Sequence, residues 1–375
     1  MFPNPYTNSK WMRESHPFLL EVAEELKKLG CECIKTPRFP SLTWILFNRK
    51  KLDVLHVHWP EQYYELAWHS ENRLLSKILG VFDFTAPLRR VLGFGWLFAF
   101  VHLLRLTGIP LLWTVHDLFP HTSQSPSKLQ LFARQYLLKH TEVLLLNCEN
   151  AAGLVEKELG QAKNVVVAPL GDYKLFYPET TNRQRARQLF RLSENESMFL
   201  FFGSQRPHRN AQELIRSFGE IPDPSVHLWV VGYTPENIRA AEEELNWSDW
   251  RVHLHLRQVS NQQVEYAIKA CDFLVMPGKN YLTSAVAVLA LSYGIPVIAP
   301  HYGCAKDMVG DAGILYDDTQ PDGLKDAMEY ALNNKESLQN TARQQISRWS
   351  WQITAEQTYK AYQLAIKHKP AHDDM

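Results

Sequence analysis

Hydrophobic positions along the chain alternate between two patterns, and together these predict an α/β protein. Runs of consecutive apolar residues, such as Val54–His58 and Val143–Asn147, are typical of short strands buried on both faces of a sheet. Segments such as Phe18–Leu29 have apolar residues three or four positions apart, as in a helix packed on a sheet, and Gly30 is a typical helix end. Strand and helix patterns that alternate in this way predict mostly parallel sheets.

The predicted elements form two series. In the first half we predict strands at Cys31–Lys35, Val54–His58, Pro110–Val115, Val143–Asn147 and Val165–Ala168, and helices at Phe18–Leu29, Val91–Leu104, Ser127–Leu138 and Glu149–Leu159. In the second half we predict strands at Met198–Phe202, Val226–Val231, Val252–Leu256, Phe273–Met276 and Pro296–Ala299, and helices at Ala211–Phe218, Pro235–Leu245, Gln262–Lys269, Ser284–Tyr293, Gly323–Asn333 and Ala355–His368.

A break in the apolar pattern separates the two series. Tyr177–Asn195 is rich in polar and charged residues, which is typical of a domain boundary. We therefore predict two doubly wound, Rossmann-like domains facing a cleft, residues 1–180 and 181–350, with a C-terminal helix in 351–375 that packs back toward the first domain. The chain starts with loop and helix where such a domain usually starts with a strand, so either that strand is dispensed with or the natural start lies upstream.

Composition excludes several classes of protein. Of the 375 residues 45% are hydrophobic, which excludes a disordered chain, and the formal net charge of zero argues against a nucleic-acid partner. The beginning of the chain lacks the apolar core of a signal peptide. The five cysteines are odd in number and scattered, so we expect free thiols, as in a reducing cytoplasm, rather than a disulfide framework.

One apolar segment has two interpretations. Val91–Leu104 is shorter than the roughly 20 residues that a membrane span requires, so a buried core helix is one interpretation. However, the segment is rich in aromatic residues and is flanked by Arg89, Arg90 and Arg105. A helix of this kind can lie in the interface of an anionic membrane, which is the second interpretation for residues 89–105.

Two loops of the second half have the residues of an anion site. The strand ending at Gly203 is followed by a loop with Arg206 and Arg209, and then by a helix. The strand Phe273–Met276 is followed by a polar loop and another helix. In doubly wound folds, ligands bind at the carboxyl ends of strands, where helix N-termini and arginines hold phosphate groups.

Several motifs, taken together, resemble those of a known enzyme family. The sequence G-x-x-R-x-x-R-N from Gly203, then D-F-x-V-x-P, T-S-A, L-A-L-x-x-G-x-P-V-I-A-P and G-x-x-x-D-x-V, resembles the donor half of GT-B glycosyltransferases near family 4. His56–Glu61 resembles the HxHWPE segment of exopolysaccharide glycosyltransferases, and Thr114–Leu118 resembles their TxHD/N segment. The resemblance spans roughly residues 17–365 and implies the GT-B fold.

The resemblance implies a site for a nucleotide-sugar donor. Arg209 matches the basic residue that neutralises the donor diphosphate, and Arg206 is expected to be a second phosphate contact. Asn280, Thr283 and Ser284 stand where the family presents a turn of backbone amides to the diphosphate.

Two further positions match less closely. Gln258 lies in the segment that contacts the nucleotide base in the family, and Asp307 occupies an acidic position of the motif, although a carboxylate that only stabilises a helix start is an equal alternative. The family's pair of glutamates is replaced here by Tyr281 and Leu289, which weakens a strict family 4 assignment.

The first half supplies the candidate catalytic residues. His116 and Asp117 follow a predicted strand, where His116 would hold the donor sugar or phosphate and Asp117 would orient it or act as a base. Glu61 is the other carboxylate available to deprotonate an acceptor. His56 and His58 face one side of their strand, and we favour packed, hydrogen-bonded side chains for both.

These features predict a glycosyltransferase that moves a sugar from a nucleoside-diphosphate sugar to a lipid-linked or polysaccharide acceptor. No cluster has the spacing of metal ligands, so we expect no metal ion and no cofactor besides the donor substrate. The expected location is the cytoplasm, with peripheral contact to the inner face of the membrane. A sugar-nucleotide epimerase of the same fold, or a non-catalytic binding protein, is the alternative.

Overall fold

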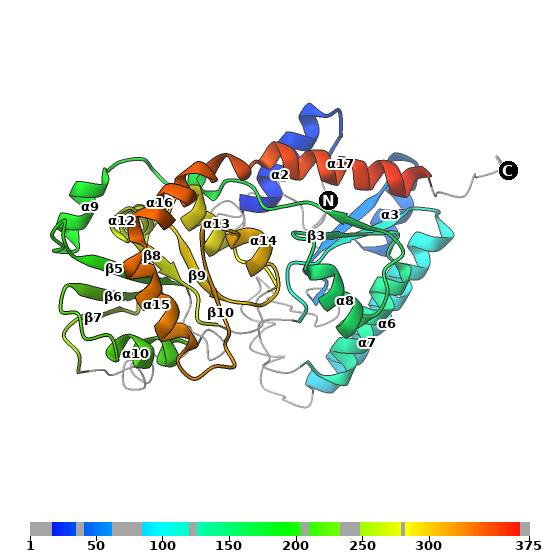
Figure 1. Cartoon of the computed structure of the whole chain (residues 1–375). Helices are drawn as coiled ribbons and strands as arrows, with labels where there is room; N and C mark the ends of the chain where they lie inside the picture. Colours follow the sequence, from blue (N-terminus) through cyan, green and yellow to red (C-terminus); the bar gives the residue numbers. More distant parts are fainter. Residues whose placement is uncertain are drawn as a thin grey trace. The chain divides into compact units, whose positions relative to one another are not determined.

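The chain forms two compact units, each built on a parallel sheet (Figure 1). The computed structural model describes residues 17–34, 41–61, 85–119, 126–203, 210–232, 248–278 and 282–367. Unit 1 comprises residues 1–147, 151–169 and 352–375, and unit 2 comprises 148–150 and 170–351. The chain therefore passes from unit 1 to unit 2 for most of its second half at Leu170, and returns at Gln352.

Unit 1 contains a four-stranded parallel sheet in the order β1-β2-β3-β4. Its strands are β1 (Leu55–His58), β2 (Leu111–Thr114), β3 (Val143–Leu146) and β4 (Val165–Val167). Its helices are α2 (Pro17–Lys28), α3 (Leu42–Asn48), α6 (Thr85–Leu106), α7 (Lys128–His140), α8 (Ala151–Leu159) and α17 (Trp351–Lys367), whose first residue belongs to unit 2. Every residue of β1, β2 and β3 is buried, as expected for parallel strands covered on both faces.

Unit 2 contains a six-stranded parallel sheet in the order β10-β9-β8-β5-β6-β7. Its strands are β5 (Ser197–Phe202), β6 (Val226–Val231), β7 (Val252–His255), β8 (Phe273–Val275), β9 (Val297–Pro300) and β10 (Gly313–Tyr316). Its helices are α9 (Arg183–Leu189), α10 (Ala211–Gly219), α12 (Asn261–Ala270), α13 (Ala285–Ser292), α14 (Ala305–Val309), α15 (Gly323–Asn333) and α16 (Lys335–Gln344). Phe199, Phe218 and Phe273 lie fully buried in its core.

The strand order of unit 2 reverses at β5. From β5 the chain adds β6 and β7 on one side, and then returns to the other side of β5 with β8, β9 and β10. Such a reversal leaves a crevice at the carboxyl ends of the two strands on either side of it, because their crossover helices lie on opposite faces. The crevice of unit 2 therefore lies beyond the ends of β5 and β8.

A buried carboxylate fixes the opposite edge of the same sheet. Asp272, which precedes β8, is fully buried and accepts hydrogen bonds from Arg183 (2.6 Å), Arg187 (3.2 Å) and the backbone N–H of Met198 (2.8 Å). Lys335 adds an ion pair at 2.7 Å. Burial raises the pKa of Asp272, but Arg183 and Lys335 hold it below its usual value, so the carboxylate stays charged. The amino ends of β5 and β8 are thereby tied to α9 and α16.

Most predicted elements are confirmed, with a few differences. Residues 31–34 form no strand, and the predicted helix Pro235–Leu245 lies outside the described residues. We did not predict β10, which has only four residues and starts with a glycine. That glycine is required, because a Cβ at Gly313 would lie 2.0 Å from the carbonyl oxygen of Val297 on the neighbouring strand.

The expectation that all five cysteines are free thiols is wrong. Cys148 and Cys304 form a disulfide within unit 2, whereas Cys31, Cys33 and Cys271 are free. The two partners are 156 residues apart in the sequence, and the fold brings their Cα atoms to 5.6 Å. No local spacing signals such a pair, so the sequence pattern could not predict it.

Helix α6 has one buried face and another part of its surface that is exposed. The helix runs from Thr85 to Leu106, and Leu97, Phe100 and Leu104 on one face are buried in the core. On another part of its surface, Val91 is 65% exposed and Leu92 is 57% exposed. None of the helices in the described ranges has an apolar stretch long enough to cross a bilayer.

Candidate functional site

The crevice of unit 2 is shaped by two glycines. Gly203 (φ 138°) directly follows β5, and Gly232 (φ 148°) directly follows β6. A Cβ at Gly232 would lie 1.8 Å from the carbonyl oxygen of Gly203, so no larger residue fits there. At the carboxyl edge of the sheet, the backbone of Gly232 therefore packs directly against the backbone of Gly203, where the loop after β5 starts.

Asn210 connects the two loops of the crevice. It precedes α10 in the left-handed conformation (φ 58°), which asparagine tolerates better than most residues. Its Nδ2 donates a hydrogen bond of 3.5 Å to the carbonyl oxygen of Pro277, which follows β8. The loops after β5 and β8, which the sequence analysis selected separately, therefore meet at the strand reversal.

The start of α13 lies at the same edge. Ser284 caps this helix, and its hydroxyl accepts a hydrogen bond of 3.2 Å from the backbone N–H of Ala287. Thr283 places its hydroxyl 3.7 Å from the sulfur of Met308. The first turn of a helix contains amides without intrahelical partners and is positively polarised, which suits an anion.

The remaining predicted donor residues are placed as follows. Arg206, Arg209 and Asn280 lie outside the described residues. Gln258 is exposed in the segment after β7. Asp307 lies in the first turn of α14, where its two carboxylate oxygens accept hydrogen bonds from the backbone N–H (2.9 Å) and side-chain amide (2.8 Å) of Asn150. Asp307 therefore has a structural partner in unit 2.

Unit 1 gathers a second group of polar residues at the carboxyl ends of β1 and β2. Nδ1 of His58 lies 2.9 Å from Nε2 of His116, and both side chains are buried. The indole of Trp59 stacks on the imidazole of His116 with 4.5 Å between ring centroids, and Phe18 contacts the same imidazole edge-on. His116, a predicted catalytic residue, is thus held in place by His58, Trp59 and Phe18.

Trp59 adopts an unusual backbone conformation. Its φ of 45° is in the left-handed region, although it is a bulky residue that precedes a proline. Such a conformation costs about 1–3 kcal/mol and persists where surrounding contacts impose it. Strain of this kind is concentrated at functional sites, and here it holds the indole against His116.

His56 is packed and hydrogen-bonded, as we predicted. Its Nε2 lies 2.7 Å from the hydroxyl of Thr114, and its Nδ1 lies 2.9 Å from the hydroxyl of Tyr362 on α17. Burial lowers the pKa of His56 and of His58 well below the usual value, and the neighbouring imidazole of His116 lowers both further. Both side chains are therefore neutral at physiological pH.

The proton positions in the histidine pair follow from one orphan atom. Within the described residues, Nε2 of His58 is buried and has no hydrogen-bond partner. An N–H without an acceptor would cost more than a bare ring nitrogen, so we assign the proton of His58 to Nδ1, where it donates to His116. His116 then accepts this hydrogen bond at Nε2 and has its own proton on Nδ1.

Glu61 and Asp117 are linked by a buried cation. Nη2 of Arg134 donates to Oε2 of Glu61 at 2.9 Å, and Nη1 of Arg134 donates to the backbone carbonyl of Asp117 at 2.8 Å. The side chain of Arg134 is 2% exposed, so the charge of Glu61 balances a buried guanidinium. Arg134 thus fixes the segments that contain both predicted carboxylates.

Sequence reasoning missed Trp59, Thr114, Arg134 and Tyr362 as members of this group. Trp59 and Thr114 lie within the HxHWPE and TxHD/N segments, and Arg134 is a cation among the apolar positions Ala133, Leu137 and Leu138 of α7, so these three had a sequence signal. Among the described residues, no group of three or more His, Cys, Asp or Glu side chains is arranged to hold a metal ion.

Comparisons with known proteins identify the kind of enzyme. Residues 182–348, which lie in unit 2, match the model of the family described as "Glycosyl transferases group 1". The chain is 27% identical to a D-inositol 3-phosphate glycosyltransferase of Corynebacterium glutamicum over 300 residues, covering 73% of this chain and 70% of the relative. It is 26% identical to a GDP-mannose:glycolipid 4-beta-D-mannosyltransferase of Xanthomonas campestris over 301 residues, covering 79% and 72%.

The fold is shared with solved glycosyltransferases. A glycosyltransferase of Rickettsia africae superposes with a TM-score of 0.63 at 14% identity, covering 94% of this chain and 95% of that one. The fold is thus GT-B, with two Rossmann-like units, as predicted. Together with the relatives above, this shows that the chain is a glycosyltransferase.

The neutral, buried histidines predict a pH dependence of stability. As the pH falls below about 6.5, the unfolded chain binds protons at His56 and His58 that the folded protein does not bind. The free energy of unfolding should therefore be highest above about pH 6.5. Below that pH it should fall by about 1.4 kcal/mol per pH unit for each of these two protons. Urea unfolding of His56→Gln between pH 7.5 and 5.5 should show a shallower decline than the parent protein. Equal declines in both proteins would contradict the assignment, and His301→Gln, on the surface of unit 2, is the control.

Proposed function

We propose that this glycosyltransferase moves a hexose from a nucleoside-diphosphate sugar to a lipid-linked acceptor of a surface polysaccharide, without a metal ion. One observation supports the donor half most directly. The segment that matches the glycosyltransferase family contains the sheet whose strand order reverses at β5, and both selected loops lie at that reversal. Doubly wound sheets bind nucleotides at this place.

The donor diphosphate would be held by charge and by helix ends. We propose that Arg209 and Arg206, from the loop after β5, pair with the phosphate oxygens. Asn280, Thr283 and Ser284 would present the loop after β8 and the first turn of α13 to the same group. Gln258 would contact the base. Asp307, although bound to Asn150, keeps its place at the edge of the sheet and would support the adjoining loop. In this scheme, arginines and helix ends stabilise the leaving diphosphate, and no metal ion is needed.

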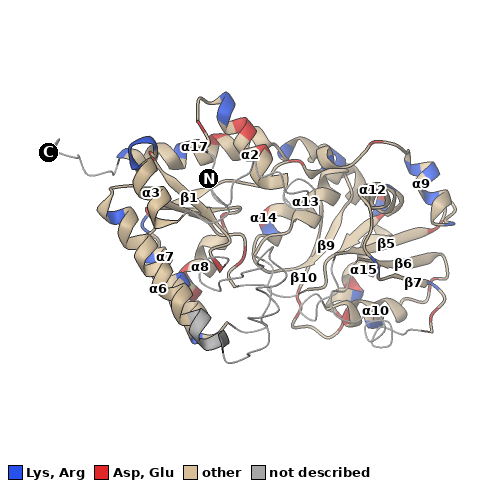
Figure 2. Cartoon of the chain, turned by 180° about the vertical axis from the view of Figure 1, so that it is seen from behind, with Lys and Arg blue, Asp and Glu red and all other residues tan. Residues whose placement is uncertain are grey.

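The acceptor half of the proposal is supported by the surface of unit 1. One relative is named as acting on a glycolipid, and another on D-inositol 3-phosphate. Helix α6 exposes Val91 and Leu92 to solvent, and along its middle the α6–α7 pair is largely uncharged (Figure 2). An apolar surface flanked by arginines fits the interface of an anionic membrane. We therefore propose that the enzyme works in the cytoplasm, bound peripherally to the inner face of the cell membrane.

The catalytic residues that we propose have different chemical roles. His116 would hold the transferred sugar or its phosphate through a hydrogen bond. Asp117 would act as the base or orient the acceptor, and Glu61 is the second carboxylate of the group. Because Glu61 neutralises the buried Arg134, removal of its charge should disturb the protein more than removal of the Asp117 charge does.

Donor use and the role of Arg209 are tested together. We expect transfer or slow hydrolysis with at least one member of a panel of UDP- and GDP-sugars, in the presence of a metal chelator. Arg209→Ala should weaken donor binding by about 1.5–3 kcal/mol, because it removes a charge-assisted phosphate contact. Arg185→Ala, on the exposed surface of α9, is the matched control. Normal donor affinity in folded Arg209→Ala would refute the proposed diphosphate site, and epimerisation without transfer would favour the alternative enzyme class.

A catalytic role of His116 should separate activity from stability. His116→Ala should lower kcat about 100-fold or more while the melting temperature changes by only a few degrees. His301→Ala is a surface control in unit 2. A large loss of melting temperature with unchanged kcat per folded molecule would instead show that His116 serves packing.

Membrane binding is tested with vesicles of defined charge. We expect the protein to sediment with anionic vesicles at low salt, and Arg89→Glu/Arg90→Glu to weaken this binding by about 1 kcal/mol per residue or more. Val91→Ser/Leu92→Ser should weaken it while retaining the charge. Leu175→Ser/Leu189→Ser, which changes exposed leucines of unit 2, is the matched control. Protein that stays in the supernatant with anionic vesicles would show that α6 is only a core helix.

A further inference from the structure

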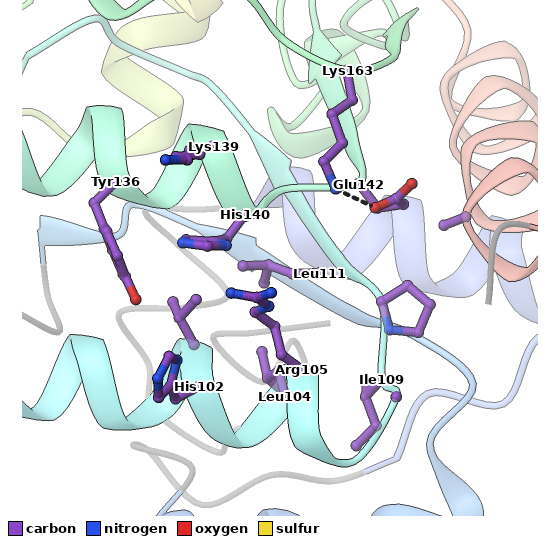
Figure 3. A pocket seen from close by; sticks show the side chains of 14 residues that line it. His102, Leu104, Arg105, Ile109, Leu111, Tyr136, Lys139, His140, Glu142 and Lys163 are labelled. Carbon is purple, nitrogen blue, oxygen red and sulfur yellow. Dashed lines mark hydrogen bonds and ion pairs between the residues drawn. The ribbon is translucent and has the colours of Figure 1, made fainter. Parts of the chain in front are cut away.

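Unit 1 contains a large pocket that the proposed reaction does not use. The pocket has a volume of about 770 Å³ and lies between the C-terminal ends of α6 and α7 and the beginning of β2 (Figure 3). Leu111, the first residue of β2, lines it, whereas His116 follows the other end of the same strand. The pocket and the histidine pair are therefore at opposite edges of one sheet. Its volume is within the range of small-molecule sites.

The floor of the pocket is apolar and rigid. Val101, Leu104, Ile109 and Leu111, which line it, are each at most 3% exposed. Ala365 of α17 completes the floor and is fully buried. These residues belong to the core of the unit, so the cavity is preformed and does not depend on a mobile loop.

The rim of the pocket is basic. Arg105 and His102 come from α6, Lys139 and His140 from α7, and Lys163 from the segment before β4. In Figure 3, Arg105 and His140 point toward each other across the space between the two helices. The acidic side chain among the described lining residues is Glu142, which pairs with Lys163 at 2.7 Å. Positive groups thus outnumber the negative one around a single cavity.

Helix ends do not fully account for this charge. Lysine and arginine in the last turn of a helix stabilise its negative end, and this explains part of the placement of Arg105 and Lys139. However, Lys163 belongs to no helix. The pKa of His140 is lowered by burial and by repulsion from Arg105, Lys139, Lys163 and His102. Burial also raises the pKa of Tyr136, beside it, so this side chain adds no negative charge. The cavity therefore keeps a net positive potential after the helix ends and Glu142 are included.

We propose that this pocket binds a phosphate-bearing anion, with Arg105, Lys139 and Lys163 contacting the phosphate oxygens. The apolar floor would take a carbon portion of the same ligand, since the cavity is larger than a phosphate group requires. Two sources have this chemistry. One is a free phosphorylated compound, and the other is the headgroup of an anionic phospholipid, because α6 also contains the apolar surface at Val91 and Leu92. The site is independent of the proposed donor site.

The free anion is tested by titrating the full chain with inorganic pyrophosphate at low salt. Binding is measured by isothermal titration calorimetry. The parent protein is Arg206→Gln/Arg209→Gln, so that pyrophosphate bound at the proposed donor site does not contribute heat. Arg105→Gln/Lys139→Gln, introduced into this parent, should weaken pyrophosphate binding at least tenfold. Lys157→Gln/Lys360→Gln changes the net charge equally at exposed positions of unit 1 and should leave the affinity unchanged. Circular dichroism and melting temperature verify that each variant folds.

The lipid source is tested by flotation with phosphatidylcholine vesicles that contain or lack phosphatidic acid. If the pocket variant (Arg105→Gln/Lys139→Gln) loses binding to phosphatidic acid vesicles and the control variant (Lys157→Gln/Lys360→Gln) does not, the ligand is a lipid headgroup. If pyrophosphate binding is lost but vesicle binding is equal in both variants, the ligand is a free phosphorylated compound. Equal behaviour of pocket and control variants in both assays would overturn the proposal. A folded Arg209→Ala variant with normal donor affinity would refute the donor site and leave this one untouched.

Discussion

Parallel pairing of the strands is the constraint on which both candidate sites depend. In a parallel sheet all carboxyl ends meet at one edge, so residues far apart in the sequence gather there without any local signal. In unit 2 this constraint places Asn210, just before α10, beside Pro277, which follows β8, although more than fifty residues separate β5 from β8. In unit 1 it places His58, at the end of β1, against His116, which follows β2. Strand order therefore determines which residues meet at each site, and the types of those residues then determine what the site can bind.

The two edges of the unit 2 sheet differ in how they are held. At the amino edge, the buried carboxylate of Asp272 forms ion pairs with Arg183, Arg187 and Lys335, so removal of this carboxylate would leave the buried charge of Arg187 without the group that balances it. At the carboxyl edge, the described contacts include the close backbone approach of Gly203 and Gly232 and the hydrogen bond from Asn210 to Pro277. A charge network thus fixes the edge away from the crevice.

The sequence predicted what depends on local pattern and missed what depends on assembly. Buried strands such as β5 and β6 and amphipathic helices such as α10 are confirmed because their apolar spacing is visible in a short window. β10 was missed because four residues starting with glycine give too weak a signal. The Cys148–Cys304 disulfide and the contact between His56 and Tyr362 join residues 156 and 306 positions apart, which only the fold brings together. His116 and Asp117 were selected because they lie in a motif. Trp59 lies in a motif too, but only the fold shows that it stacks on His116, and Arg134 lies in no motif.

The two sites of unit 1 are separated by the length of β2. This strand has four residues, so its first and last Cα atoms are about 10 Å apart at roughly 3.3 Å per residue. Between them lies Trp113, fully buried, with the guanidinium of Arg134 5.7 Å from its ring. The basic pocket and the histidine pair therefore share one rigid strand and one helix, α7, which contains Arg134 at its middle and Lys139 and His140 at its end. A ligand in the pocket would bind to the same elements that fix Glu61 and Asp117, without contacting either carboxylate. Coupling between two sites requires an element with two discrete arrangements, whereas Arg134 holds both segments in one arrangement through its hydrogen bonds, so this geometry favours independent sites over coupled ones.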